Sequence, residues 1–428
     1  MDDDGSEHEG GWILVADGLV REVGPGPRPE ADEVEDLHGA VVTPGLVNTH
    51  HHLWQNLTRA RAQQENLFGW LKALYPVWAA IDDEAEYAAA RVGLAELALS
   101  GCTTVFDHHY LFPPGAVGLL EAEIQAAREL GVRIVASRGS MDLGKSNGGL
   151  PPDAIVERRD HALAATEQAA GLADGARVQI AVAPCSPFSV TRELMAESAD
   201  LARRLGLRLH THLAETVEEE RYCRDLYGCT PVEYLQELGW LAEDVWCAHC
   251  VHLSAADVAT FAEHDVGVAH CPSSNMRLGA GLAPVADLLA GGVRVGLGVD
   301  GSASNERGDL FLEVKQALLV ARARDGPAAL SARGALRLGT RGGAAVLGRS
   351  DIGELSSGKR ADLAVWRTDG LELGGAADPV AGLVLSGPHR AERLYVGGEA
   401  VVREGRLVHG DEEEIAREHR VQARRFEP

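Results

Sequence analysis

The sequence predicts an α/β fold, a closed (β/α)8 barrel of the TIM type with a small β-sandwich formed by both chain ends. Three features of the 428 residues predict it. Short apolar runs alternate with helical stretches, polar residues gather where the apolar runs end, and the two ends of the chain differ in pattern from the middle. Strands that alternate with helices predict a parallel sheet, and eight such units can close into a barrel.

Eight apolar runs are the predicted barrel strands. Ala-, Leu- and Glu-rich stretches with helical periodicity lie between them, and suitable N-caps are Asp82 or Asp83, Thr191 and Ser254. We expect the catalytic barrel to occupy residues 45–351. In chain order the runs are VVTPGLVNTHHH, CTTVFDHH, VRIVASRG, VQIAVAPC, LRLHTHLAE, VWCAHCVHL, VGVAHCPSSN and VRVGLGVDG.

The chain ends have a different pattern. Residues 11–43 and 352–409 contain short strand-like runs separated by turns, and EEEIAREHRVQARRFEP predicts a terminal helix. We therefore expect residues 1–44 and 352–428 to form one small β-sandwich domain with a C-terminal helix. The first strand-like run follows the turn DDDG with no run ahead of it, so we expect that its usual partner strand is missing.

Composition excludes several classes of protein. There are 40 lysine and arginine residues against 64 aspartate and glutamate residues, a formal net charge of −24. Affinity for nucleic acid depends on basic contacts to phosphate, so we expect no nucleic-acid partner. No apolar run reaches the about 20 residues of a membrane span, and the acidic N-terminus has no signal-peptide pattern. Seven cysteines without a paired framework indicate reduced thiols, so we expect a cytoplasmic protein without a membrane partner.

Four residues at predicted strand ends form a set of metal ligands. His50 and His52 are two residues apart at the end of the first strand, so both side chains point into the barrel mouth. His51 points the other way and is expected to pack. His212 ends the fifth strand, and Asp300 ends the eighth. Three imidazole nitrogens and one carboxylate oxygen suit Zn2+, with water in the remaining position, while Fe2+ and Mn2+ stay open.

The sequence favours one metal ion at this site over two. A dinuclear site usually needs a bridging ligand, often a modified lysine on the fourth strand, and VQIAVAPC contains no lysine. His210 is expected to be a hydrogen-bonded core residue one layer below His212. His270, at the end of the seventh strand, is equally suited to ligation and to packing. Three cysteines near strand ends lack zinc-ribbon spacing and are expected to pack as small apolar residues: Cys247, Cys250 and Cys271.

Three residues near these ligands can move protons. Glu215 lies three residues past His212, where it is not needed as a ligand and can deliver a proton to a substrate. His249 ends the sixth strand and can polarise the attacking water or a developing oxyanion. Asp300 can bind metal and also accept a proton from water. We expect these three residues to be catalytic. A structural role stays open for His249, and His252 is the less suitable partner.

Six motifs are spread over most of the length of the chain: PGLVNTHHHL, HTHLAE, AHCVHL, HCPSSNMRLGAGLAP, GLGVDGSASN and GKRADLAVW. On these motifs the chain resembles the amidohydrolase superfamily, specifically its aminohydrolase branch of nucleobase and nucleoside deaminases. The resemblance implies one metal site and two assisting residues: His50, His52, His212 and Asp300 as ligands, with Glu215 and His249 taking part in the chemistry.

Three positions separate this chain from the adenosine-type deaminases of that branch. Those enzymes carry Glu, Arg and His where this chain has Gly69, Leu150 and Cys185, so groups expected to hold ribose are absent. The motifs HHLWQNLTRA, WLKALYPVWA, FDHHYLF, SRGSMDLGKSNGGLPPD and APCSPFSV resemble the 8-oxoguanine deaminases. Isoxanthopterin deaminases and hydroxyatrazine hydrolases share part of the pattern, and all act on flat heteroaromatic rings.

Three residues are candidates for substrate contacts. Gln55 and Arg138 offer hydrogen bonds to ring nitrogens and carbonyl oxygens, and Cys185 leaves room for a C8 oxygen. An exposed loop position for Gln55 and simple packing for Cys185 stay open. Three aromatic residues can stack on a planar ring, although core packing is the commoner role of each: Trp54, Trp78 and Tyr110.

The predicted reaction is the hydrolytic deamination of 8-oxoguanine to urate and ammonia. Asp300 takes a proton from water, hydroxide attacks C2, Glu215 protonates a ring nitrogen and His249 stabilises the tetrahedral intermediate. The alternatives are a guanine, isoxanthopterin or hydroxy-s-triazine aminohydrolase, a ring-opening cyclic amidohydrolase, and a metal-bound scaffold without activity. We expect a small heteroaromatic substrate as the partner. We also expect a homo-oligomer, although no sequence feature indicates the number of subunits.

Overall fold

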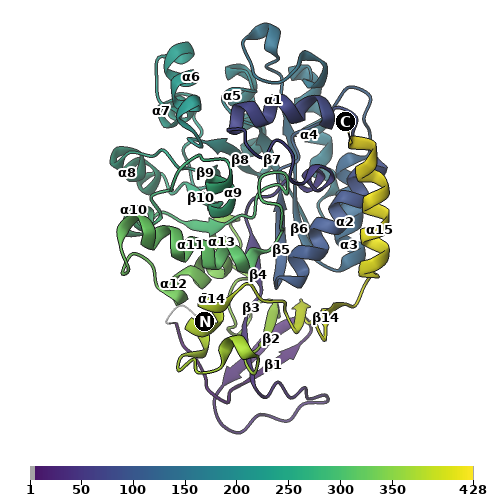
Figure 1. The fold of residues 1–428 in the computed structure, drawn as a ribbon, viewed down its shortest axis with the longest axis vertical. Helices are drawn as coiled ribbons and strands as arrows, with labels where there is room; N and C mark the ends of the chain where they lie inside the picture. Colours follow the sequence, from purple (N-terminus) through teal and green to yellow (C-terminus); the bar gives the residue numbers. More distant parts are fainter. Residues whose placement is uncertain (1–4, 428) are drawn as a thin grey trace.

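The computed structural model describes residues 5–427 and contains the predicted closed barrel (Figure 1). Its strand order is β10-β11-β4-β5-β6-β7-β8-β9, and all neighbouring strands are parallel. Strands that follow one another in the chain are therefore neighbours in the barrel, and the predicted fold class is confirmed. The barrel strands are β4 (Leu46–Asn48), β5 (Cys102–Asp107), β6 (Arg133–Ser140), β7 (Val178–Pro184), β8 (Arg208–Leu213), β9 (Val245–His249), β10 (Gly267–His270) and β11 (Val295–Leu297).

Helices surround the barrel, and three begin at the predicted caps. The side chains of Asp82, Thr191 and Ser254 each accept a hydrogen bond from a backbone N–H in the first turn of α2, α5 and α8. The full set of helices in the barrel region is α1 (Leu67–Trp78), α2 (Asp83–Leu99), α3 (Leu119–Leu130), α4 (Arg159–Ala169), α5 (Arg192–Leu205), α6 (Val217–Tyr227), α7 (Pro231–Glu237), α8 (Ala255–Glu263), α9 (Pro272–Arg277), α10 (Val285–Ala290), α11 (Leu310–Asp325), α12 (Ala332–Arg337) and α13 (Gly343–Val346). Shorter helical turns are η1 (Leu53–Thr58), η2 (Lys145–Asn147), η3 (Asp153–Ile155), η4 (Ala170–Leu172), η5 (Leu338–Gly342), η6 (Leu371–Leu373) and η7 (Arg424–Phe426).

Strands from the N-terminal and C-terminal segments form antiparallel sheets below the barrel in Figure 1. Strand β3 (Ala40–Pro44) pairs with β12 (Leu363–Arg367) in a five-stranded sheet of order β15-β14-β13-β12-β3. The predicted boundaries at residues 44/45 and 351/352 stay a prediction, and residues 1–4, which hold most of the DDDG turn, lie outside the described chain. The other strands are β1 (Trp12–Ala16), β2 (Leu19–Gly24), β13 (Arg393–Val396), β14 (Glu399–Arg403) and β15 (Arg406–Leu407).

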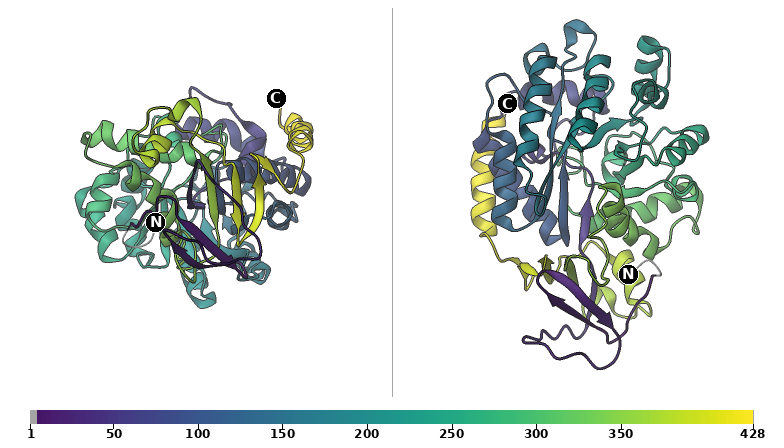
Figure 2. Two further views of the ribbon diagram at one scale, coloured as in Figure 1. Left: turned by 90° about the horizontal axis from the view of Figure 1, so that it is seen from below. Right: turned by 180° about the vertical axis from the view of Figure 1, so that it is seen from behind.

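The C-terminal segment contains one helix that the sequence analysis did not predict and one that it did. Helix α14 (Pro379–Ser386) interrupts the strand-like region, because Asp378 caps it and Pro379 is suited to its first turn. The terminal helix, α15 (Glu412–Ala423), forms as predicted and lies along α2 on the barrel (Figure 2). It also contacts η1, where His419 Nε2 donates to the Asn56 carbonyl at 3.0 Å. Helical periodicity predicted α15 but not the surface on which it packs.

The barrel interior is filled by side chains. Phe106 and Trp246 lie with ring centroids 4.8 Å apart, and His210 packs against both. All seven cysteines are buried and free of disulfides. No helix within residues 5–427 has the length and apolar character needed to span a membrane. The packed layer leaves the carboxyl ends of the strands as the place for a site.

Candidate active site

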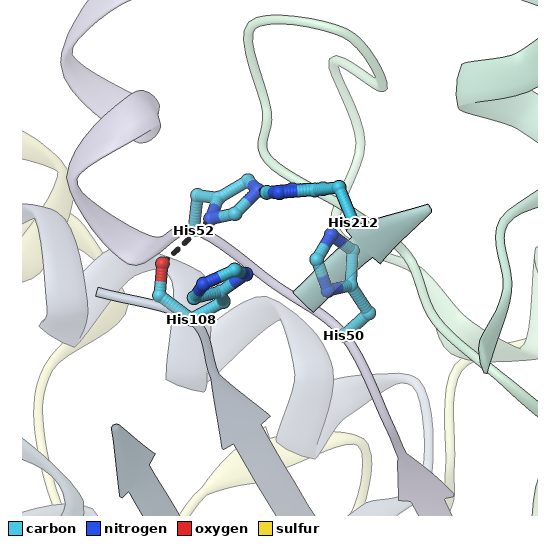
Figure 3. Close-up of side chains that lie close together, drawn as sticks. All are labelled: His50, His52, His108 and His212. Atoms are coloured by element: carbon cyan, nitrogen blue, oxygen red, sulfur yellow. Dashed lines mark hydrogen bonds between the residues drawn. The ribbon is translucent and has the colours of Figure 1, made fainter. Parts of the chain in front are cut away.

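The four predicted ligands converge at the carboxyl ends of the strands. Figure 3 shows His50 and His52 just beyond β4 and His212 on β8, with their rings around one small space. The Nε2 atoms of His52 and His212 are 3.0 Å apart. Oδ1 of Asp300 lies 3.4 Å from Nε2 of His50 and 3.4 Å from Nε2 of His52. The fold thus brings together all four residues, which come from three separate strands.

Hydrogen bonds to the outer ring nitrogens fix the tautomers of two of these histidines. Nδ1 of His52 donates to the His108 carbonyl at 2.7 Å, and Nδ1 of His212 donates to the Cys185 carbonyl at 2.7 Å. A carbonyl oxygen only accepts, so each Nδ1 carries the proton and each Nε2 presents a lone pair. Two lone pairs that face each other at 3.0 Å repel unless a cation lies between them.

A hydrogen bond to His210 fixes the tautomer of His50 in the same way. Nδ1 of His210 donates to the Trp246 carbonyl at 3.0 Å, so its Nε2 is the acceptor for Nδ1 of His50 at 2.9 Å. The fully buried Nε2 of His50 is then also a lone pair, and it has no hydrogen-bond partner among the described residues. Three convergent nitrogen lone pairs and one carboxylate fit a divalent cation. His210 is the hydrogen-bonded core residue that the sequence predicted.

Asp300 is held rigidly beside these nitrogens. Its Oδ2 accepts from Ser274 Oγ at 2.5 Å and from Ser304 Oγ at 3.1 Å, and its Oδ1 accepts from the Gly301 N–H at 2.7 Å. The backbone φ of Asp300 is 64°, in the left-handed region. Such strain costs about 1–3 kcal/mol and is typical of functional sites.

His249, at the end of β9, lies close to the carboxylates of both Glu215 and Asp300. Nε2 of His249 lies 3.7 Å from Oε2 of Glu215 and 3.9 Å from Oδ2 of Asp300. Burial raises the pKa of Glu215 to about 7. Burial alone would lower the pKa of His249, but the carboxylates of Glu215 and Asp300 outweigh it and raise the pKa. An acid that titrates near neutrality and an imidazole that favours protonation can both donate protons.

A cavity borders this cluster and contains two of the three predicted substrate contacts. Gln55 and Cys185 line it, and Oε1 of Gln55 is buried without a hydrogen-bond partner among the described residues. Tyr110 lines it as well, whereas Trp54 and Trp78 are buried outside its lining. The remaining lining residues are His52, Leu67, Trp70, Leu71, Tyr75, Phe188, His212, Glu215, His249, Leu278, Asp300 and Ser304.

The structure does not bring Arg138 to the cavity. Its guanidinium forms a bidentate pair with Glu157, at 2.6 Å and 2.9 Å, and lies 3.5 Å from the ring centroid of Phe112. Both members of the pair are nearly buried. His270 is also separate from the ligand cluster, and neither of its ring nitrogens has a hydrogen-bond partner within the described chain.

Two residues near the site were missed by sequence reasoning. His108 belongs to the compact group formed with His50, His52 and His212, and its ring stacks on His212 at 4.6 Å. It ends a predicted strand in FDHH, the same signal that identified the other ligands. Glu219 accepts from the backbone N–H groups of Ala214 and Glu215 at 2.9 Å and 3.0 Å, which fixes the loop that carries Glu215.

Comparison with known proteins decides the family. The model of the amidohydrolase family matches residues 41–400, most of the chain. The chain belongs to the amidohydrolase family. As a member it resembles 8-oxoguanine deaminase of Pseudomonas aeruginosa, with 47% identity over 96% of this chain and 94% of that protein. It also resembles an isoxanthopterin deaminase from an unknown prokaryotic organism, with 36% identity over 98% and 92% of the two chains.

Solved structures agree with this membership. The atrazine chlorohydrolase of Arthrobacter aurescens TC1, crystallised with zinc, superposes with a TM-score of 0.92 at 35% identity, over 96% of this chain and 94% of that chain. The deaminases among the similar proteins show that this member of the amidohydrolase family is an enzyme that hydrolyses C–N bonds. Its buried cluster of histidines and one aspartate has the donors of the family's metal site.

Proposed function

We propose that this enzyme hydrolyses 8-oxoguanine to urate and ammonia. The observation that carries the reaction class is the placement of Glu215, His249 and Asp300 within one acid–base group beside three convergent imidazole lone pairs. The choice of 8-oxoguanine rests on the 47% identity to a deaminase of that base. The cavity supports a flat substrate, because Trp70, Tyr75 and Tyr110 line it.

His50, His52, His212 and Asp300 would hold one divalent ion, for which we propose Zn2+. Imidazole nitrogens with a single carboxylate suit this ion, and a similar structure contains zinc. When bound, the ion supplies a nucleophile at neutral pH by lowering the pKa of water from about 15.7 to about 7.

The protein's own groups then move the protons of the reaction. Oδ2 of Asp300 accepts a proton from the attacking water, with the hydroxyl groups of Ser274 and Ser304 holding it in place. Glu215, protonated below its pKa of about 7, donates to a ring nitrogen next to C2. A C2–O bond forms, the exocyclic amine takes the proton held by Asp300, and the C2–N bond breaks so that the amine leaves as ammonia. The new C2 hydroxyl returns its proton to Glu215 as it becomes a carbonyl.

His249 and Gln55 have supporting roles in this scheme. Nδ1 of His249 donates to Oδ1 of Asn275 at 2.9 Å, which aims Nε2 at the carboxylates and the reacting carbon. A protonated Nε2 there stabilises negative charge that develops on the tetrahedral intermediate. The unpartnered Oε1 of Gln55 can accept from a ring N–H, and Cys185 leaves space for the oxygen at C8.

Amine release from a panel of four substrates tests the proposal, with ammonia measured for the purines and isoxanthopterin and ethylamine measured for hydroxyatrazine. The panel contains 8-oxoguanine, guanine, isoxanthopterin and hydroxyatrazine, with kcat/KM measured for each. The expected result is that 8-oxoguanine has the highest kcat/KM. A higher value for guanine, isoxanthopterin or hydroxyatrazine would reassign the substrate within this group of aminohydrolases, and product without released ammonia or alkylamine would indicate ring opening instead.

A further inference from the structure

A second group of buried metal-binding side chains lies behind the active site. It contains Glu86 on α2, His109 just after β5 and Glu123 on α3, and we call these three residues the rear cluster. Helices α2 and α3 lie side by side in Figure 1 and pack closely along their lengths. All three side chains are fully buried. None of them lines the substrate cavity, so the proposed reaction does not use them.

The donor atoms of the rear cluster have no hydrogen-bond partners in the part of the chain that the structure describes. Both carboxylate oxygens of Glu86, both of Glu123, and Nδ1 of His109 are buried without a hydrogen bond within residues 5–427. Nδ1 of His109 lies 3.7 Å from Oε1 of Glu86 and 3.9 Å from Oε2 of Glu123. Those separations are too long for hydrogen bonds. Native interiors rarely leave so many polar atoms unsatisfied in one place.

Charge makes the arrangement more unusual. Asp107 is also fully buried and lies near the rear cluster, and one of its oxygens is likewise unpartnered in the described chain. No lysine or arginine within residues 5–427 forms an ion pair with Glu86, Glu123 or Asp107. Burial and the neighbouring carboxylates raise the pKa of Glu123 well above its usual value, and burial raises that of Asp107 to about 7. Without a metal ion, these acids can stay buried only by taking up protons or by pairing with a protonated His109, whose pKa Glu86 and Asp107 raise against the effect of burial.

In its neutral form, His109 can offer a ring nitrogen to a metal ion. Its Nε2 donates to the Leu111 carbonyl at 3.0 Å, so in the neutral ring Nδ1 presents a lone pair toward the two glutamates. One imidazole nitrogen and two carboxylates are donors that Zn2+, Fe2+ and Mn2+ accept. Donors on one tetrahedral Zn2+ are about 3.3–3.6 Å apart at usual bond lengths, so the observed separations need only small adjustments.

We propose that Glu86, His109 and Glu123 bind a divalent transition-metal ion that is distinct from the ion of the active site. This ion has a structural role, because the surrounding side chains seal it from the cavity. It links α2, the end of β5 and α3. The indole of Trp54 lies between His109 and His52, with ring centroids 4.8 Å and 5.0 Å away. Asp107 accepts from the Leu53 N–H at 2.7 Å, so the site lies under the turn that carries Gln55.

Metal content of the full-length protein tests this proposal independently of any activity. Protein is expressed with added zinc, desalted, and analysed for zinc per chain by mass spectrometry. We expect two equivalents in the wild type and one in Glu86→Gln or Glu123→Gln. His212→Ala should also retain one equivalent, because the rear cluster remains intact. Glu313→Gln is the matched control, since Glu313 is equally buried but hydrogen-bonded by Ser273 and Asn305, and it should retain two.

Diffraction at the zinc edge locates the ions directly. An anomalous peak among Glu86, His109 and Glu123 is expected both in the wild type and in His212→Ala. In the wild type it should accompany the peak of the active-site ion. One equivalent in the wild type that falls to none in His212→Ala would overturn the proposal and leave a proton-sharing network in its place. Two equivalents in a folded Glu123→Gln variant would overturn it as well. If the glutamine variants do not fold, the His212→Ala result decides.

Discussion

The active-site cluster and the rear cluster are both buried and rich in metal donors, yet they differ in surroundings. At the active site, Nδ1 of His52 and of His212 donates to a backbone carbonyl, and His52, His212 and Asp300 line a cavity. In the rear cluster, the carboxylate oxygens of Glu86 and Glu123 have no hydrogen-bond partners among the described residues, and neither residue lines the substrate cavity. Catalytic metal sites keep an open position and structural sites are closed. Access to a cavity therefore separates the two proposed roles more clearly than ligand type does.

Removal of metal should produce the largest difference between the clusters. Dialysis against a chelator is expected to remove the active-site ion, which borders the cavity, and to abolish deamination. The sealed rear ion should remain, so zinc content should fall from two equivalents to one. Added Zn2+ should restore activity. Loss of both ions at equal rates would contradict the distinction between an open and a closed site.

Glu215→Gln should have the next largest effect. The amide keeps the size of the side chain but cannot donate an acidic proton, so kcat should fall by about 10²–10⁴-fold. Zinc content should be unchanged, because Glu215 is not among the proposed ligands. Glu123→Gln makes the same chemical change in the rear cluster and should leave kcat within a few-fold of wild type. Near-normal turnover of Glu215→Gln would remove this residue from proton transfer.

Much of the active site could be predicted because strand ends carry a simple rule. A polar residue at the end of an apolar run in a parallel barrel must face the same mouth as its equivalents. That rule predicts that His50, His52, His212 and Asp300 lie together. It also applied to His108, which sequence reasoning overlooked because two consecutive histidines gave no indication of which ring faces inward.

Helical and paired residues were harder to predict. Tyr75 and Trp70 line the cavity from α1, and helical periodicity does not reveal which part of a helix reaches a site. Arg138 was a candidate substrate contact, but Glu157 lies 19 residues further along the chain and binds its guanidinium instead. The rear cluster joins two helices and a strand end, so only the packing of α2 on α3 brings its members together.

Ser274→Ala tests how strongly the active site depends on its hydrogen bonds. Ser274 Oγ donates to Oδ2 of Asp300 at 2.5 Å and is buried. Loss of such a supporting contact typically costs about 10–100-fold in metal affinity or activity. Zinc affinity at the active site should fall by that factor, measured by competition with a chelator, while the rear ion is unaffected. An unchanged affinity would mean that Ser304 and Gly301 are sufficient to orient Asp300.

The smallest effect is expected from pH. Burial raises the pKa of Glu215 to about 7, and the proposed reaction needs its protonated form. Below pH 7 the acid is protonated and kcat/KM should be level; above it, kcat/KM should fall by about tenfold per pH unit. The residual activity of Glu215→Gln should lack this inflection, because the amide does not titrate. Glu123→Gln should keep it. A shifted inflection in Glu123→Gln would show that the two clusters are electrostatically coupled through Trp54 and that burial does not isolate them.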